Sequence, residues 1–510
     1  MMELLPEATA LTYFNAVALV IGFWLISVVL YGLYNITLHP LRSYPGPPLW
    51  RAYRFPWVRS TLAGRFPTDV LKLHNTYGPV VRVSPNELSY TDSRASKPIY
   101  GHHNPTAEGC SEFVKDLGEY QVPPNGVRSI LSADTTTHGR YRRLLSHSFS
   151  EKGMREMQPR IQSYVEQLIQ GLKDVAKTDS YIDISEWFTW ATFDMIGDLA
   201  FGKPFNCLET REMDPWMLAV FGNVKSTMYV NAIRNYGLGF LLPWLTPKGL
   251  LELRQANTDR AFNKTKERLK YGTDRGDFWD NVIAKSDFDK GTGMTLGEMT
   301  SNAAVLVLGG SETTATLLSG TIYLLLMNPD KMEKLLGEVR EAFNHDSEID
   351  LISVGKLDYM LAVLDEAMRV YPPVPNQGNR LVPASGAMIA GKWVPGGTSV
   401  QVQQWASNHS SSNFAQPDAF IPERWLTNAP AEFATDDRAA RTPFSLGPRN
   451  CIGRNLAYAE VRLILARVCF NFDLELDEKR CKDWIRDQKV YALWEKNPLW
   501  VRLSMRSAKT

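Results

Sequence analysis

The chain has 510 residues, of which 44% are hydrophobic and 22% are charged, and its net charge at pH 7 is +1. This length can bury a large core, as one big domain or as two to three ordinary ones. The near-neutral charge gives no reason to expect nucleic acid as a partner. The scattered cysteines have no zinc-ligand spacing and indicate free thiols in a reducing compartment. They are Cys110, Cys207, Cys451, Cys469 and Cys481.

The first predicted element is a membrane-spanning helix over Leu11–Tyr34. No Asp, Glu, Lys or Arg lies between Glu7 and Arg42, and a helix of this length reaches about 36 Å, enough to cross a bilayer. A cleaved signal peptide is the alternative, but the stretch is long for one, lacks a basic start and has no clear cleavage site. We therefore expect residues 1–40 to form an uncleaved, single-pass anchor.

Charges around this segment predict its orientation. Glu3 and Glu7 precede it, and basic residues beginning with Arg42 follow it, so residues 41–510 are expected on the cytosolic side. The glycosylation sequon at Asn35 would then be unused, because it lies on the wrong side or at the membrane surface.

The rest of the chain is predicted to be mainly α with a small β region. The proline-rich run Tyr44–Pro48 is a stiff, extended exit from the membrane. A hairpin is expected from Val80–Val83 and Glu87–Tyr90, and short strands return between Met388 and Gln403. Helical patterns dominate from His138 to Arg369, with no internal repeat or low-complexity linker.

A long central helix is predicted from a capping box at Thr295 and Glu298 to the residue before Asn328. The run Gly309–Thr314 interrupts its apolar pattern, and glycines inside a helix cost about 1 kcal/mol each. One interpretation is a widened turn beside a ligand, with Glu312 and its neighbouring alcohol facing that ligand. The other is close helix packing at the glycines and a solvated glutamate.

The most specific pattern is Phe444-x-x-Gly447-x-Arg449-x-Cys451-x-Gly453, directly before an apolar helical pattern. A cysteine before a helix N-terminus lies in positive potential, which stabilises a thiolate. Glycines allow close approach of a large flat group, and an arginine can bind a carboxylate. A buried structural cysteine is the alternative. The pattern favours a thiolate ligand of haem iron, with Arg449 on a haem propionate.

This loop resembles the haem-binding loop of the cytochrome P450 family, the haem-thiolate monooxygenases. The resemblance extends along nearly the whole chain and implies the cytochrome P450 fold over residues 41–510, a haem-binding monooxygenase domain. The implied cofactor is haem b, with its iron coordinated by the Cys451 thiolate. The central-helix glycine would lie beside the haem, and the catalytic residues Glu312 and Thr313 would handle the protons of O₂ activation. The first glycine, Gly309, departs from the alanine of many relatives.

The resemblance also implies further haem contacts. Phe444, Gly447 and Gly453 belong to the loop itself. His138, Arg142 and Arg380 are candidates for the haem propionates, together with Arg449. A tryptophan is common in the family at the position of His138, and an imidazole can donate the same hydrogen bond. For each basic residue the alternative is an ordinary solvated side chain.

A structural network is implied as well. Glu366 and Arg369 share one helix face, and the segment Phe420–Trp425 supplies Arg424. In the family these three residues form a buried, mutually satisfied set, so their role here is expected to be architectural.

The implied reaction inserts one oxygen atom from O₂ into a lipophilic small molecule. The chain has no convincing nucleotide-binding motif, so electrons are expected from NADPH-cytochrome P450 reductase, docked near Arg438, Arg441 and Arg454. The motifs look like those of microsomal fungal members, which implies the endoplasmic reticulum membrane and a secondary metabolite such as a terpenoid, polyketide or alkaloid.

Four regions are expected to line the substrate pocket. They are Gly101–Thr137, Met228–Leu245, Val305–Gly309 and Val374–Asn379. Two other functions stay open at this point. One is a haem-thiolate isomerase or dehydratase that needs no external electrons, and the other is a non-catalytic membrane haem sensor or carrier.

Overall fold

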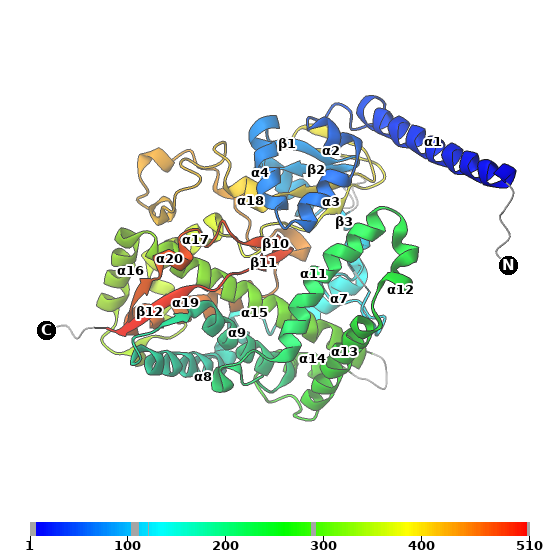
Figure 1. The fold of residues 1–510 in the computed structure, drawn as a ribbon. Helices are drawn as coiled ribbons and strands as arrows, with labels where there is room; N and C mark the ends of the chain where they lie inside the picture. Colours follow the sequence, from blue (N-terminus) through cyan, green and yellow to red (C-terminus); the bar gives the residue numbers. More distant parts are fainter. Residues whose placement is uncertain (1–6, 104–111, 121, 287–291, 507–510) are drawn as a thin grey trace.

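The computed structural model describes residues 7–103, 112–120, 122–286 and 292–506, and Figure 1 shows a mostly helical molecule with small, separate sheets. The long helices are α1 (Glu7–Thr37), α8 (Glu151–Ala176), α9 (Ile184–Phe201), α11 (Pro215–Asn235), α13 (Lys248–Leu269), α15 (Leu296–Leu326), α16 (Pro329–Ala342), α17 (Asp358–Val370) and α19 (Arg454–Asn471). The shorter ones are α2 (Pro48–Ala52), α3 (Phe55–Leu62), α4 (Phe66–Tyr77), α5 (Ser96–Tyr100), α7 (Thr135–Leu145), α10 (Cys207–Thr210), α12 (Leu242–Leu245), α14 (Asp280–Ala284), α18 (Gln404–Asn408) and α20 (Glu478–Cys481). The predicted fold class, mainly α with a small β region, is confirmed.

The largest sheet has the strand order β1-β2-β8-β5-β3, in which only β2 and β8 run parallel. Its strands are β1 (Val80–Ser84), β2 (Glu87–Tyr90), β3 (Val114–Lys115), β5 (Arg380–Leu381) and β8 (Ser399–Val402). The other strands are β4 (Tyr181–Asp183), β9 (Phe472–Leu476) and β12 (Trp500–Met505) in one sheet, and the pairs β6 (Ala387–Ile389) with β7 (Lys392–Val394) and β10 (Lys489–Tyr491) with β11 (Leu493–Glu495). The hairpin predicted around Ser84–Asn86 is therefore present, and β3 and β5 extend its sheet toward the cysteine loop.

Helix α15 runs through the middle of the helical part and packs against α9, α13, α17 and α19. It begins with the predicted capping box, in which Thr295 and Glu298 each accept the other's backbone N–H. Gly320 lets α15 approach the chain beyond α17, because a Cβ there would lie 2.2 Å from the Tyr371 ring. The central helix was predicted correctly because its start, length and stop signal are all local.

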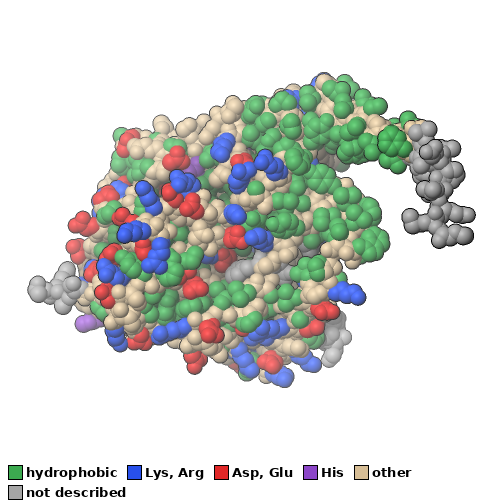
Figure 2. Space-filling model, viewed as in Figure 1, with side chains coloured by type: hydrophobic (Ala, Val, Ile, Leu, Met, Phe, Trp, Pro, Cys, Tyr) green, Lys and Arg blue, Asp and Glu red, His purple; other side chains and the backbone are tan. Residues whose placement is uncertain are grey.

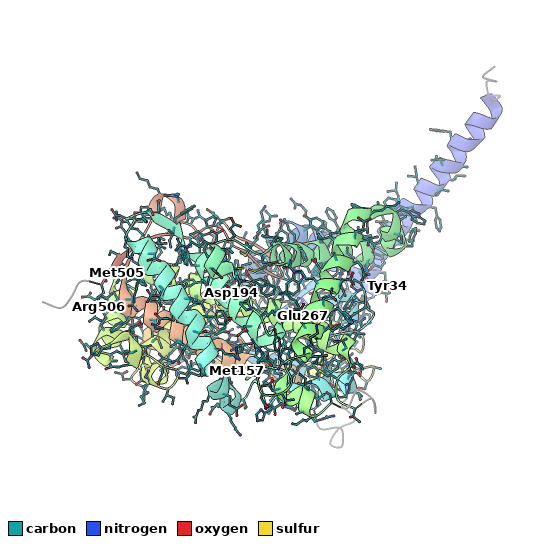
Figure 3. The ribbon with its side chains drawn as sticks, turned by 90° about the horizontal axis from the view of Figure 1, so that it is seen from below. Tyr34, Met157, Asp194, Glu267, Met505 and Arg506 are labelled. Carbon is teal, nitrogen blue, oxygen red and sulfur yellow. The ribbon has the colours of Figure 1, made fainter. Side chains whose placement is uncertain are left out.

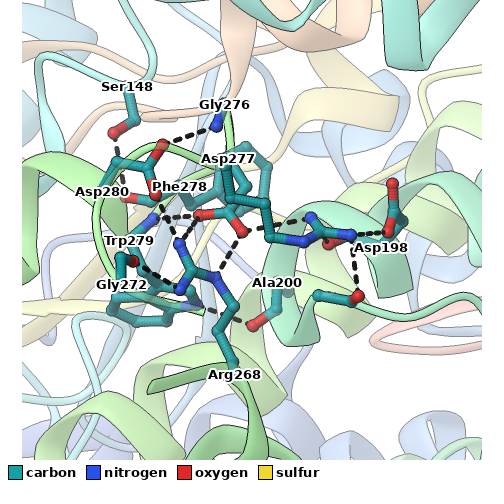
Figure 4. A network of polar contacts seen from close by, with 12 residues as sticks. Ser148, Asp198, Ala200, Arg268, Gly272, Gly276, Asp277, Phe278, Trp279 and Asp280 are labelled. Atoms are coloured by element: carbon teal, nitrogen blue, oxygen red, sulfur yellow. Dashed lines mark hydrogen bonds and ion pairs between the residues drawn. The ribbon is translucent and has the colours of Figure 1, made fainter. Parts of the chain in front are cut away.

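A buried charge network fixes the connection from α13 to α14 against α9 (Figure 4). The Arg268 guanidinium, fully buried, donates to Asp277 and Asp280, and Arg275 donates to Asp198 at the end of α9. Charges that are buried in pairs and hydrogen-bonded are tolerated, whereas a lone one is costly. The network holds α13 at a fixed distance from α9, and α13 in turn forms a wall of the cavity described below.

The implied three-residue network is present. Arg369 makes a two-pronged contact with Glu366, at 2.8 and 2.9 Å, and Arg424 donates to the same carboxylate at 3.1 Å. The Trp425 indole N–H adds a fourth bond to Glu366 at 2.8 Å. These hydrogen bonds keep the pKa of Glu366 below its usual value although the carboxyl is buried. The network joins α17 to the segment that leads into the cysteine loop.

Helix α1 extends away from the body of the molecule, with Tyr34 near its base (Figures 1 and 3). Its segment Phe14–Thr37 has a mean hydropathy of 2.4 and is long and apolar enough to cross a membrane. Hydrophobic side chains cover it and continue over the adjoining surface (Figure 2), where Phe240 and Trp244 are 64% and 78% exposed. Exposed apolar surface on this scale indicates contact with a membrane or a partner.

The base of α1 is joined to the body by hydrogen bonds. Tyr53 donates to the Val28 carbonyl at 3.1 Å, and the buried Asn35 amide donates to the Ala52 carbonyl at 2.8 Å. Arg82 donates to the Asn35 carbonyl at 2.7 Å. The amide nitrogen that a glycan would need is thus buried and bonded, which agrees with the prediction that the sequon is unused.

Candidate functional site

The cysteine loop is shaped by its glycines and by one backbone hydrogen bond. The Cys451 N–H donates to the Phe444 carbonyl at 2.8 Å, which closes the loop just before α19. Gly447 has φ of +69°, and a Cβ there would lie 2.0 Å from the Tyr100 carbonyl oxygen of α5. Only glycine fits that position, because both the backbone conformation and the space exclude a side chain. The loop is therefore held between α5 and α19.

The Cys451 thiol is accessible from one side although protein surrounds it on the others. Burial raises the pKa of the Cys451 thiol, while the Gly453 amide and the charges of Arg142 and Arg454 lower it. Iron bound to the sulfur would remove the thiol proton, because coordination deprotonates a thiol outright.

Four predicted basic residues gather beside this loop. Arg142 donates to the Asn450 carbonyl and side-chain oxygens at 2.7 and 2.6 Å, directly before the cysteine. Arg449 donates to Glu112 and to the Ala133 carbonyl, both at 3.0 Å. The remaining two, His138 and Arg380, are 6% and 5% exposed.

Lys115 of β3 completes this cluster and was missed from the sequence. Burial and the charges of Arg380 and Arg449 lower its pKa to about 7. Burial, followed by the charges of Arg449, Lys115 and Arg142, lowers the pKa of His138 to about 4. Among the described residues, the Glu112 carboxylate faces these groups and pairs with Arg449, whereas Arg142 has amide and carbonyl oxygens as its partners. Lys115 could have been found only by knowing that β3 pairs with β5 beside Arg380.

The two glycines on α15 have different surroundings. A Cβ on Gly310 would lie 2.6 Å from Ile196 of α9, so this glycine serves close helix packing. A Cβ on Gly309 would meet no atom within 4 Å, so this glycine faces open space. Helix α15 is continuous here, and the Thr313 hydroxyl donates to the Gly309 carbonyl at 2.6 Å. Close packing therefore explains Gly310, while Gly309 faces open space without the widened turn that was expected.

Glu312 is neither solvated nor free. Its buried carboxylate forms an ion pair with Lys496, which lies between β11 and β12, and Lys496 also donates to the Thr316 hydroxyl at 3.0 Å. The Thr316 hydroxyl in turn lies 3.4 Å from Glu312 Oε1. The solvated alternative is wrong, because a lysine distant in sequence neutralises the glutamate inside the protein. Lys496 is the second functional residue that the sequence did not reveal.

A cavity of about 810 Å³ lies between α11, α13 and α15. Three of the four regions that were expected to line the cavity do so, through Pro123, Val230, Leu242 and Val305. The fourth region, Val374–Asn379, does not line this cavity, since its Gln377 is bonded inward to Gln404 and Thr442. Helix α13, which was not expected, supplies a large part of the wall. Part of the Gly101–Thr137 region, with Cys110, lies outside the described residues.

Comparison with known proteins decides the family. A family model described as "Cytochrome P450" matches residues 44–501. The chain belongs to the cytochrome P450 family. Averantin hydroxylase of Dothistroma septosporum is 51% identical over 490 residues, covering 95% of this chain and 90% of that protein. Cytochrome P450 monooxygenase stcF of Emericella nidulans is 48% identical over 96% of this chain, and versicolorin B desaturase stcL of the same organism is 45% identical over 93%. The matched segments cover 99% of stcF and 95% of stcL.

Membership makes this chain a haem-thiolate monooxygenase, and its relatives indicate fungal secondary metabolism. The residues present fit a haem. The Cys451 thiol is exposed, the guanidinium groups of Arg142, Arg380 and Arg449 lie beside its loop, and a Cβ at Gly309 would meet no atom within 4 Å. Haem brings two carboxylates, which neutralise buried guanidinium and ammonium groups. When bound, the haem of a cytochrome P450 activates O₂.

The cytochrome P450 surface near the cysteine loop carries the three arginines that were expected to meet a reductase. Arg454 is exposed, and Arg438 is exposed although it donates to the Arg424 carbonyl. The Arg441 side chain is only 12% exposed and forms an ion pair with Asp365 at 3.1 Å. Arg441 is therefore a poorer candidate than the other two.

Proposed function

We propose that residues 1–40 anchor this cytochrome P450 in the endoplasmic reticulum membrane and that residues 41–510 form its haem-binding domain in the cytosol. Haem b would be held by the Cys451 thiolate, with Phe444, Gly447 and Gly453 shaping the loop below it. The propionates would replace the present partners of Arg142 and Arg449, and would also meet His138, Arg380 and Lys115. The three arginines gathered beside the exposed Cys451 thiol are the observation that carries this assignment.

Thr313 and Glu312 would manage protons on the α15 side. The Thr313 hydroxyl donates a hydrogen bond to the Gly309 carbonyl, and it can rotate to hold a water molecule or to pass on a proton. The Glu312 carboxylate, held in place by Lys496, would accept a proton and pass it on. This pair supports oxygen activation rather than isomerisation or dehydration, because those reactions consume no protons from such a relay.

For the substrate we propose averantin, hydroxylated at one carbon. The support is the 51% identity to an averantin hydroxylase, which exceeds the 45% identity to a versicolorin B desaturase. The cavity of about 810 Å³ is large enough for a compound of several fused rings. Electrons would come from NADPH-cytochrome P450 reductase at the surface that carries Arg438 and Arg454.

The test uses the full chain in membranes with the reductase, NADPH and isotopically labelled O₂. With averantin we expect a product that has gained one labelled oxygen atom, and no product without NADPH. Loss of two hydrogens from versicolorin B, without labelled oxygen, would instead make this chain a desaturase. Turnover that needs no NADPH would refute the monooxygenase assignment. A Cys451→Ala variant, which should lose the red-shifted Soret band of the reduced carbon monoxide complex, is the control.

A further inference from the structure

The cavity between α11, α13 and α15 contains two arginines without partners. Arg234, in the last turn of α11, and Arg254, in the second turn of α13, both line it. Within the described ranges, neither guanidinium has a hydrogen bond, an ion pair or an aromatic ring below it. Burial and the charge of Arg234 lower the pKa of Arg254, so the two like charges act on each other.

Other arginines of the same region are neutralised. Arg260, less than two turns beyond Arg254 on α13, pairs with Asp214 at 2.7 Å. Arg268, at the end of that helix, is held by Asp277 and Asp280. Arg234 is exposed and Arg254 is half-buried, so water screens their repulsion in part, but no acid of the described residues neutralises either charge. An anion placed between them removes that repulsion.

Two further donors on the cavity wall have no acceptor among the residues that the structure describes. The Asn257 amide nitrogen and the Trp216 indole nitrogen are buried without a hydrogen bond, and both residues line the cavity. A buried donor without an acceptor is unfavourable, because it has lost its hydrogen bonds to water. The α11 and α13 walls therefore present donors in excess, while Ala304 and Val305 of α15 present an apolar wall closer to Gly309.

We propose that this cavity binds a flat, mostly apolar substrate by an acidic oxygen at one edge, an ionised carboxylate or phenolate, held between Arg234 and Arg254. The inference rests on the proposed function, because it takes the cavity as the substrate chamber. The anionic edge lies at α11 and α13, so the neutral edge points toward Gly309 and Thr313. Oxidation is thus directed to the end of the substrate opposite its acidic group.

Binding tests this without turnover. The full-length haem protein is titrated with anthraquinone-2-carboxylate, 2-hydroxyanthraquinone and the neutral 2-methoxyanthraquinone, and dissociation constants are taken from calorimetry. These probes share one rigid tricyclic body. We expect at least one acidic probe to bind about tenfold more tightly than the methoxy compound. Preference for the carboxylate at all pH values, or for the phenol only where it is ionised, distinguishes the two anions.

The variants Arg234→Gln and Arg254→Gln, singly and combined, should reduce that preference, to less than about twofold in the double variant. Lys266→Gln removes a charge from the exposed side of α13 and should leave the preference unchanged. Arg254→Lys keeps the charge and should retain most of the preference. Equal binding of acid and ether by the native protein, or an unchanged preference in the double variant, would overturn the proposal. Turnover of averantin alongside that result would leave the proposed function standing.

Discussion

Replacing Glu460 with glutamine should stabilise the protein above neutral pH. Glu460 lies on α19 and is fully buried, and within the described part of the chain neither of its carboxylate oxygens has a hydrogen bond of good geometry. Burial raises the pKa of its carboxyl to about 8, against a small opposing effect of the Thr314 hydroxyl. The folded chain thus keeps this proton at pH 7, whereas the unfolded chain, with a pKa of about 4.5, has released it.

The sign and size of the effect follow from proton linkage. The pKa of the Glu460 carboxyl is higher in the folded chain than in the unfolded chain. Its contribution to the free energy of unfolding is therefore fully present below about pH 4.5 and is lost as the pH rises toward about 8. With these two pKa values, Glu460 lowers the free energy of unfolding by about 3 kcal/mol more at pH 7.5 than at pH 5. Glutamine has the same shape as the protonated acid and does not titrate, so the variant escapes this loss.

Thermal unfolding of the purified haem protein measures the difference. For a domain of about 460 residues, about 1 kcal/mol corresponds to 1 °C in Tm. We therefore expect the difference in Tm between the Glu460→Gln variant and the native protein to increase by about 3 °C in favour of the variant from pH 5 to pH 7.5. Glu333→Gln, at an exposed position of α16, should show no such growth. A pH-independent difference, or a variant less stable than the native protein at pH 7.5, would refute the reasoning.

Three further predictions concern the site itself. Gly447→Ala places a methyl group 2.0 Å from the Tyr100 carbonyl at a φ of +69°, so the ratio of haem to protein absorbance should fall by more than about half; full haem content would contradict the steric argument. Thr313→Ala should keep its haem but lower the coupling of NADPH to product by about tenfold, with hydrogen peroxide rising in proportion; unchanged coupling would count against the proton role. Lys496→Met leaves the Glu312 carboxylate buried and unpaired and should cost about 3 kcal/mol, measured as Tm. Adding Glu312→Gln to this variant should recover most of the lost Tm. A failure to recover it would show that the lysine matters for packing alone.

The sequence predicted features whose determinants are local. The capping box at Thr295 and the loop around Cys451 are each specified within ten residues, and both were placed correctly. The contacts it missed join distant segments. Lys496 reaches Glu312 across 184 residues, and Arg254 faces Arg234 only because α13 folds back beside α11. The glycine pair on α15 shows the same limit, since only the position of Ile196 distinguishes packing at Gly310 from open space at Gly309.

The joint between α1 and the body has a mechanical consequence. Gly32 lies so close to Tyr53 that a Cβ would be 2.3 Å from its hydroxyl oxygen, and the Asn35 hydrogen bonds lie one turn further on. If α1 spans a bilayer as proposed, these contacts would transmit its height and tilt to the catalytic domain. The depth of the domain would then follow from this joint rather than from the length of a tether.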